Sequence, residues 1–214
     1  MAEPSSSELA GWLTLFWPTV LTMLVRIGMG ITDTAFVGHL QHDASFPSAK
    51  SMDFLSATSL ALTWQGITSI ICFNGGPPAL STLAGQAFGA GNLPLMGTWL
   101  HLSLLYSLVA AVPVAVSWWF TADVLRVALS RHACSETCLT LAEAFSQRSL
   151  VWLFPTTAYF SLNTFLTCQK IVRPQMMISI AAAALNAVLN YVCIYTLGMG
   201  YLGSPIATAT TRWL

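Results

Sequence analysis

The sequence predicts an all-α integral membrane protein, a polytopic helix bundle, because charged residues are scarce and unevenly placed. Hydrophobic residues make up 55% of the 214 residues and charged residues only 7%, whereas a soluble domain carries roughly 25% charged residues. No Asp, Glu, Lys or Arg occurs in residues 54–122 or 174–211. A membrane-crossing helix needs about 20 apolar residues, so the first stretch accommodates two spans and the second accommodates one span and the start of another. Continuous apolar runs favour helices over a transmembrane barrel, whose short strands alternate in polarity.

The bundle is expected to occupy residues 12–214, after a polar and slightly acidic tail at residues 1–11. Five complete spans are predicted, and the start of a sixth near Tyr201 is expected to stop at Leu214 before it can cross. The second span should be interrupted at residues 74–78 (NGGPP), because proline removes a hydrogen-bond donor and clashes with the preceding turn. The predicted complete spans are residues 12–37, 54–88 with that interruption, 95–120, 139–168 and 174–197. The predicted loops are residues 39–51, 88–92, 121–135 and 170–173.

Several functional classes are excluded by composition. The eight basic and eight acidic residues cancel, so the chain has no basic face for nucleic acid. Cys134 and Cys138 with His132 do not have the spacing of a zinc site, and no fourth ligand is nearby. No pairing of a nucleophile with a base is evident, and His39, His42 and His132 are expected in loops. We therefore expect a protein that is not an enzyme and that has no cofactor, with a membrane enzyme as the distant second class.

Two charged residues of the first span raise a functional question. A charge at the bilayer centre costs about 2.5–3.5 kcal/mol on insertion scales, so such residues usually face a bundle interior or a water-filled cavity. Asp33 is either an interfacial residue at a helix end or an ion or proton site. Arg26 lies seven residues earlier, about 10 Å along the axis and on nearly the same face. A contact between them needs the full Arg26 stem or a bridging water.

Uncharged polar residues form a second set within the apolar runs. Asn186 and Asn190 are four residues apart, so they lie on one face of the fifth span. Asn163 lies in the fourth span, and Thr208 lies at the start of the sixth. These side chains either line a site with Asp33 or hold helices together by hydrogen bonds, each contributing about 0.6–2 kcal/mol.

Four segments resemble a known family, and they occur along the chain in the family's order. They are residues 28–40 (GMGITDTAFVGHL), 79–92 (ALSTLAGQAFGAGN), 169–175 (QKIVRPQ) and 200–208 (GYLGSPIAT). These segments resemble parts of multidrug and toxic compound extrusion (MATE) transporters. In order, they resemble the first-span signature, the end of the second span, the connection between spans four and five in the eukaryotic branch, and the start of the sixth span.

The resemblance implies one lobe of a larger transporter. MATE proteins have twelve spans in two related six-helix lobes, and this chain resembles an incomplete first lobe. The implied function is a secondary active antiporter that exports organic or xenobiotic compounds in exchange for protons or sodium. The alternative is a truncated, non-transporting fragment or a half-protein that assembles with another chain. The implied partners are a small organic, often cationic substrate, the lipid bilayer of a plasma or organelle membrane, and a second lobe.

The resemblance also assigns a cation-coupling site. Asp33 falls on the first-span acidic residue that prokaryotic members use for coupling. The polar positions that surround it in the family's folded lobe are occupied here by Asn163, Asn186, Asn190 and Thr208. Their oxygens suit a hard cation such as sodium, and no other metal is expected. Arg26 departs from the family pattern, and a neutralising contact with Asp33 is one consequence to be tested.

Overall fold

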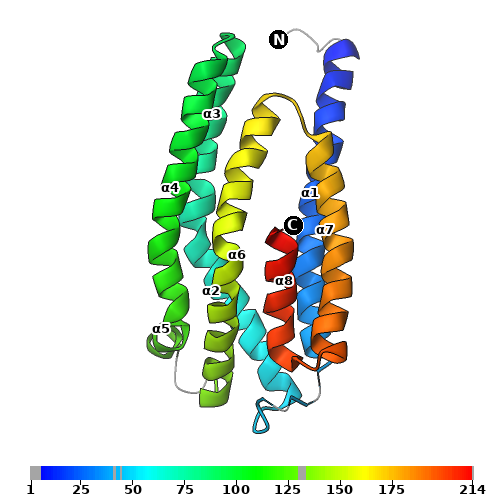
Figure 1. The fold of residues 1–214 in the computed structure, drawn as a ribbon, viewed down its shortest axis with the longest axis vertical. Coiled ribbons are helices and arrows are strands. Elements are labelled where there is room, and N and C mark those ends of the chain that lie inside the picture. The colour runs from blue at the N-terminus through cyan, green and yellow to red at the C-terminus, as the bar shows by residue number, and fades with distance from the viewer. Residues whose placement is uncertain (1–5, 41, 44, 130–133, 214) are drawn as a thin grey trace.

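The computed structural model describes residues 6–40, 42, 43, 45–129 and 134–213. Every element in these ranges is helical, and the long helices run alternately up and down one axis (Figure 1). The elements are α1 (Ser6–Gly38), α2 (Ser51–Asn74), α3 (Gly76–Gly89), α4 (Leu93–Trp119), α5 (Thr121–Ala128), α6 (Glu136–Cys168), α7 (Arg173–Tyr191), the π-helical η1 (Val192–Thr196), the 3-10 turn η2 (Gly200–Leu202) and α8 (Gly203–Trp213).

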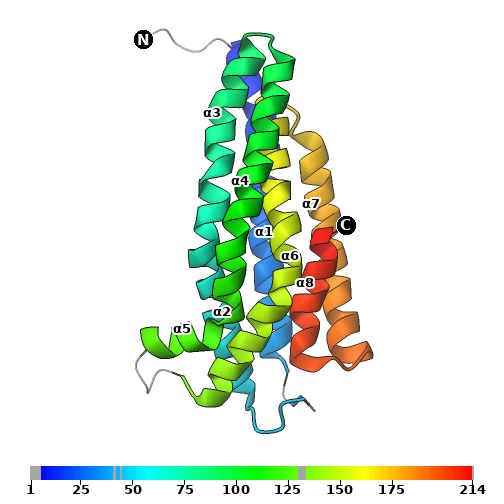
Figure 2. The ribbon, with the colours of Figure 1, turned by 60° about the vertical axis from the view of Figure 1, so that its left-hand side comes forward.

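Helix α6 is the centre of the bundle. It packs against α2, α3 and α4 on one side and against α8 on the other, while α1 packs mainly against α7. Helix α8 rises between α6 and α7 and ends near the middle of the bundle (Figure 1). The short helix α5 lies across the lower end of the bundle (Figure 2). The arrangement brings α1, α6, α7 and α8 together around a shared interior.

Four stretches are long and apolar enough to cross a membrane: Gly11–Gly38, Ser51–Gly89, Leu93–Trp119 and Arg173–Thr196. The fourth of the five predicted spans, α6, has 33 residues but is less apolar. Its polar residues face inward, because the buried positions of the helix include Ser146, Ser149, Thr156, Thr157 and Ser161. A central helix has little lipid-facing surface, so it needs fewer apolar residues than the outer helices. The prediction of a multi-pass all-α bundle is confirmed.

Two boundaries differ from the prediction. Helix α1 begins at Ser6, inside the stretch expected to be a polar tail, whose residues 1–5 lie outside the described ranges. The predicted loop at residues 121–135 contains α5, which packs Ala122 and Leu125 into the lower core. Arg126 bonds Asp123 at 3.0 Å and Glu136 at 2.9 Å. Asp123 and Arg126 therefore lie on the exposed face of a short amphipathic helix.

The predicted interruption after α2 is confirmed at Gly75. The carbonyl of Ile71, in the last turn of α2, accepts a hydrogen bond of 3.1 Å from the Tyr106 hydroxyl on α4. A Cβ at Gly75 would overlap the Tyr106 ring, so glycine permits this close approach. Pro77 lies in the first turn of α3, where its missing N–H costs nothing. Tyr106 on α4 therefore stabilises the break between α2 and α3.

Replacing Tyr106 by Phe should lower the free energy of unfolding by about 0.5–1.5 kcal/mol, the net contribution of one hydrogen bond. The measurement is unfolding of the purified chain in mixed detergent with increasing denaturing detergent. Tyr191→Phe is the matched control, since within the described part of the chain the Tyr191 hydroxyl has no hydrogen bond and 58% of the residue is exposed. Equal stability of the two variants would contradict this role for Tyr106.

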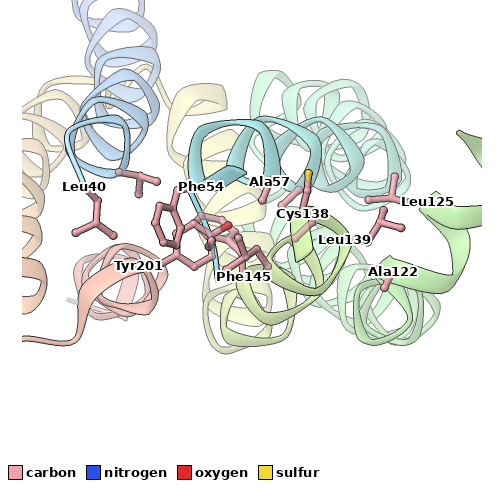
Figure 3. Close-up of a cluster of buried hydrophobic side chains, with 14 of the residues drawn as sticks. Leu40, Phe54, Ala57, Ala122, Leu125, Cys138, Leu139, Phe145 and Tyr201 are labelled. Carbon is pink, nitrogen blue, oxygen red and sulfur yellow. The ribbon is translucent and has the colours of Figure 1, made fainter. Parts of the chain in front are cut away.

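A buried cluster holds the lower end together. Tyr201 is fully buried and packs against the rings of Phe54 on α2 and Phe145 on α6 (Figure 3). Phe46, in the loop before α2, also packs against Tyr201. The Tyr201 N–H donates to the Asp43 carboxylate at 2.7 Å. The loop predicted at residues 39–51 is thereby pinned to the segment that leads into α8.

A disulfide joins Cys134 to Cys138 at the start of α6. The spacing of the two cysteines did not predict this pairing, and His132 lies outside the described residues. Within the described ranges, no group of three or more His, Cys, Asp or Glu side chains is placed to hold a metal ion.

Candidate functional site

Asp33 lies inside the bundle and is not exposed at the end of its helix. It is only 6% exposed, and both carboxylate oxygens accept hydrogen bonds. Asn190 Nδ2 donates to Oδ1 at 2.7 Å, and Thr208 Oγ1 donates to Oδ2 at 2.8 Å. The carboxylate therefore connects three helices, α1, α7 and α8, that are far apart in sequence.

Asn186 forms a second layer behind this contact. It is fully buried, and its Nδ2 donates to Thr208 Oγ1 at 3.3 Å. Asn190 Nδ2 also approaches the Asn186 carbonyl oxygen at 3.0 Å, one turn earlier on α7. The predicted common face of the two asparagines is confirmed, and it is directed at Asp33.

One acceptor of the cluster is unpaired. Asn190 Oδ1 is buried and has no hydrogen-bond partner among the described residues, although an unpaired buried polar atom normally costs about 1–3 kcal/mol. The atom of Asn190 that faces Asp33 is Nδ2. The residues of the cluster nevertheless carry carboxylate, amide and hydroxyl oxygens, which are the ligands that hard cations prefer. The π-helical η1 begins two residues after Asn190, and such segments are frequent at functional sites.

A cavity of about 230 Å³ opens beside Asp33, between α1, α2, α6 and α8. Its polar lining includes Gln65, Ser69, Ser149, Thr156 and Thr208. Gln65 is 2% exposed, and its Oε1 has no partner within the described ranges. Asp33 thus borders a polar, intramembrane cavity.

Arg26 does not pair with Asp33. Its guanidinium lies over the rings of Phe160 at 4.2 Å and Tyr159 at 5.3 Å, both on α6. The salt bridges found between described residues involve only Arg126. The proposed neutralisation of Asp33 is therefore wrong for this structure, because the Arg26 stem extends toward α6 and does not follow α1 toward Asp33.

Asn163 lies apart from the cluster, which corrects its predicted place beside Asp33. Its carbonyl oxygen accepts a bond of 2.9 Å from Gln175 at the start of α7. Asn190 lies fifteen residues further along α7, which is about 22 Å at the helical rise. The side-chain oxygen of Asn163 is also buried and unpaired among the described residues, but no hydrogen bond joins it to Asp33.

Arg212 belongs to the site and was not predicted. It donates to Thr156 Oγ1 at 3.3 Å, and its guanidinium lies over Trp152 at 4.5 Å. In the sequence it served only to mark the end of a charge-free stretch. Its spacing could have predicted a role, because Arg212 is four residues after Thr208 and so lies on the same face of a short helix.

The fold and the site define a multi-pass membrane protein whose helices surround a polar cavity with one buried carboxylate. The MatE family matches residues 18–192 of the sequence, and the chain belongs to this family.

Individual relatives agree with this assignment. The chain is 31% identical to an uncharacterized transporter of Schizosaccharomyces pombe over 96% of its own length and 36% of the relative's. It is 27% identical to Protein DETOXIFICATION 16 of Arabidopsis thaliana over 100% of its own length and 42% of the relative's. The crystal structure of the eukaryotic MATE transporter AtDTX14 superposes with a TM-score of 0.81 at 22% identity, covering 96% of this chain and 43% of that one. The chain therefore spans less than half the length of these relatives and corresponds to about one lobe.

Proposed function

We propose that this chain is the ion-coupling lobe of a secondary active antiporter, which exports small organic compounds in exchange for protons or sodium ions. One observation carries the proposal: Asp33 is buried among amide and hydroxyl groups in the wall of an intramembrane cavity. Ionisable residues in such places commonly serve ion or proton pathways. Membership of the MatE family and similarity to DETOXIFICATION proteins support export as the direction of use.

In the proposed mechanism, the Asp33 carboxylate takes up the coupling ion. For sodium, the oxygens of Asn190 and Thr208 are the available neighbouring ligands, with Asn186 holding Thr208 in place. Proton or sodium binding changes the hydrogen bonds that join α1 to α7 and α8. An ion drives a conformational change only if it binds the two conformations with different affinity, and a three-helix junction is a suitable place for that difference.

The substrate path is proposed to need a second lobe. Transporters built from repeats form their central site between the repeats, and one lobe supplies one wall. The MATE resemblance implies amphipathic, often cationic substrates and a plasma or organelle membrane. The alternative function is a half-protein that acts only when it assembles with another chain.

Efflux measured in vesicles with a proton or sodium gradient distinguishes transport by this chain alone from transport that needs a second lobe. This chain alone should give no gradient-dependent efflux of a fluorescent organic compound. Reconstitution with the second lobe of DETOXIFICATION 16 should give efflux, because both walls of the path are then present. The two lobes of DETOXIFICATION 16, expressed as separate chains, are the control for assembly. Efflux by this chain alone would refute the two-lobe path, and no efflux by the hybrid with active control halves would refute the antiporter.

A further inference from the structure

We propose that Arg26 and Arg212 bind the acidic head of an amphipathic organic anion, a carboxylate or sulfonate with an aromatic body, in the cavities on either side of them. The inference deepens the proposed function, on which it rests, by naming the substrate class of the same lobe. It departs from the cationic substrates that the family resemblance implies.

The two arginines, one on α1 and one on α8, pack against the same face of α6. Trp152, Thr156 and Phe160 are spaced four residues apart and so share a face of that helix. Arg212 contacts Trp152 and Thr156, while Arg26 lies over Phe160. These levels differ by about one and a half turns, or about 8 Å. Both guanidiniums therefore lie against the same face of α6, and the proposed anionic head lies between them and accepts hydrogen bonds from both.

Both arginines line two cavities. One is the cavity of about 230 Å³ beside Asp33. The other, of about 290 Å³, lies between α1, α6, α7 and α8 and is also lined by Tyr159, Ser179 and Trp213. The arginines line both cavities, and the larger one lies at the lower end of the size range of small-molecule sites, roughly 300–1,000 Å³.

The charges at this place do not balance. Asp33 is the single carboxylate in the described lining of either cavity, and its oxygens bond to Asn190 and Thr208. Neither arginine has a carboxylate partner within the described residues, and Arg212 Nε is buried without a hydrogen bond there. Uncompensated positive charge inside a membrane is costly. A carboxylate or sulfonate would compensate it with bidentate hydrogen bonds, which arginine favours.

The walls around the arginines suit an aromatic body. Trp152, Phe160 and Phe73 line the cavity beside Asp33, and Tyr159 and Trp213 line the adjoining one. The Phe73 and Phe160 rings lie 4.4 Å apart. A flat ring system against these surfaces gains apolar burial and stacking. The site therefore combines a positive centre with aromatic sides, which is complementary to an aromatic acid.

Equilibrium binding to the chain in lipid nanodiscs tests the inference with two probes of matched shape, naphthalenesulfonate and naphthyltrimethylammonium. The anion should bind at least tenfold more tightly than the cation. Arg212→Gln and Arg26→Gln should each weaken anion binding about 10- to 100-fold, the usual effect of removing one partner of a buried charged contact. Arg148→Gln is the control, since Arg148 is an exposed arginine of the same α6, and it should bind the anion as the unmodified chain does.

Several outcomes would overturn the proposal. These are cation binding as tight as anion binding, undiminished anion binding in both arginine variants, or binding of neither probe by a chain with a normal melting transition. Inorganic sulfate should bind more weakly than naphthalenesulfonate, and equal binding would refute the role of the aromatic walls. Because no ion gradient is applied, failure of ion coupling at Asp33 would not change these results. Conversely, selection of the cation would refute this inference and leave the coupling role of Asp33 intact.

Discussion

Replacing Asp33 by Asn should reduce ion-driven efflux to the background rate in a transporter that contains this lobe and a second one. Asparagine keeps the size of the side chain and one acceptor oxygen, but it removes the charge and the titrating group. Without them the site cannot exchange protons and loses its anionic ligand for sodium. The measurement is efflux from vesicles under an imposed proton or sodium gradient, compared with efflux in its absence.

The variant should nevertheless fold. Because Arg26 lies over Phe160 and not beside Asp33, the substitution leaves no ion pair broken, and we expect a loss of about 1–3 kcal/mol from weakened hydrogen bonds. Asp123→Asn is the control, since Asp123 pairs with Arg126 at an exposed position, and it should transport normally. Normal transport by Asp33→Asn would contradict the coupling role. If Asp33→Asn is unstable and adding Arg26→Gln restores its stability, the two residues form an ion pair instead.

Replacing Gly200 by Ala should destabilise the folded chain by about 2–4 kcal/mol, which combines backbone strain with loss of a buried hydrogen bond. Gly200 has φ +56°, a left-handed conformation that a Cβ disfavours. The added methyl group would also collide with the Asp43 carboxylate. Moving Asp43 breaks its bond to the Tyr201 N–H and disturbs the lower core where α8 begins.

Gly198→Ala separates the two causes. Gly198 has φ +65°, but a Cβ there would meet nothing within 4 Å. It should therefore cost only the backbone strain, about 1–2 kcal/mol. The measurement is the unfolding midpoint in a denaturing-detergent titration of both variants. If the two variants lose equal stability, the contact between Gly200 and Asp43 does not stabilise the protein.

The resemblance to MATE transporters rested on four segments in the family's order and not on any single residue. The four segments that resembled MATE signatures lie in α1, in α3 with the following turn, at the start of α7, and in η2 with α8. Two of them contribute to the polar interior, since they contain Asp33 and Thr208.

What the sequence determined by itself was the set of long helices and the shared face of Asn186 and Asn190. A bilayer offers no hydrogen bonds to the backbone, so long charge-free stretches had to become helices, and proline and glycine had to interrupt them at Gly75. The spacing of Asn186 and Asn190 placed both on one face, because helical periodicity is local. These predictions required no knowledge of which helices are neighbours.

Only the tertiary structure decided which side chains meet. Asp33 and Asn190 are 157 residues apart, and their contact depends on how α1 and α7 align along the bundle. The same alignment separates Asn163 from the site, directs Arg26 toward α6 and brings in Arg212. Gly203 contributes to this alignment. A Cβ there would collide with the backbone of Cys193 and Ile194, so glycine allows α8 to approach η1 closely. This close approach sets the height of Thr208 beside Asp33. The distance and relative height of packed helices result from close packing summed over the whole bundle, and no local pattern in the sequence contains them.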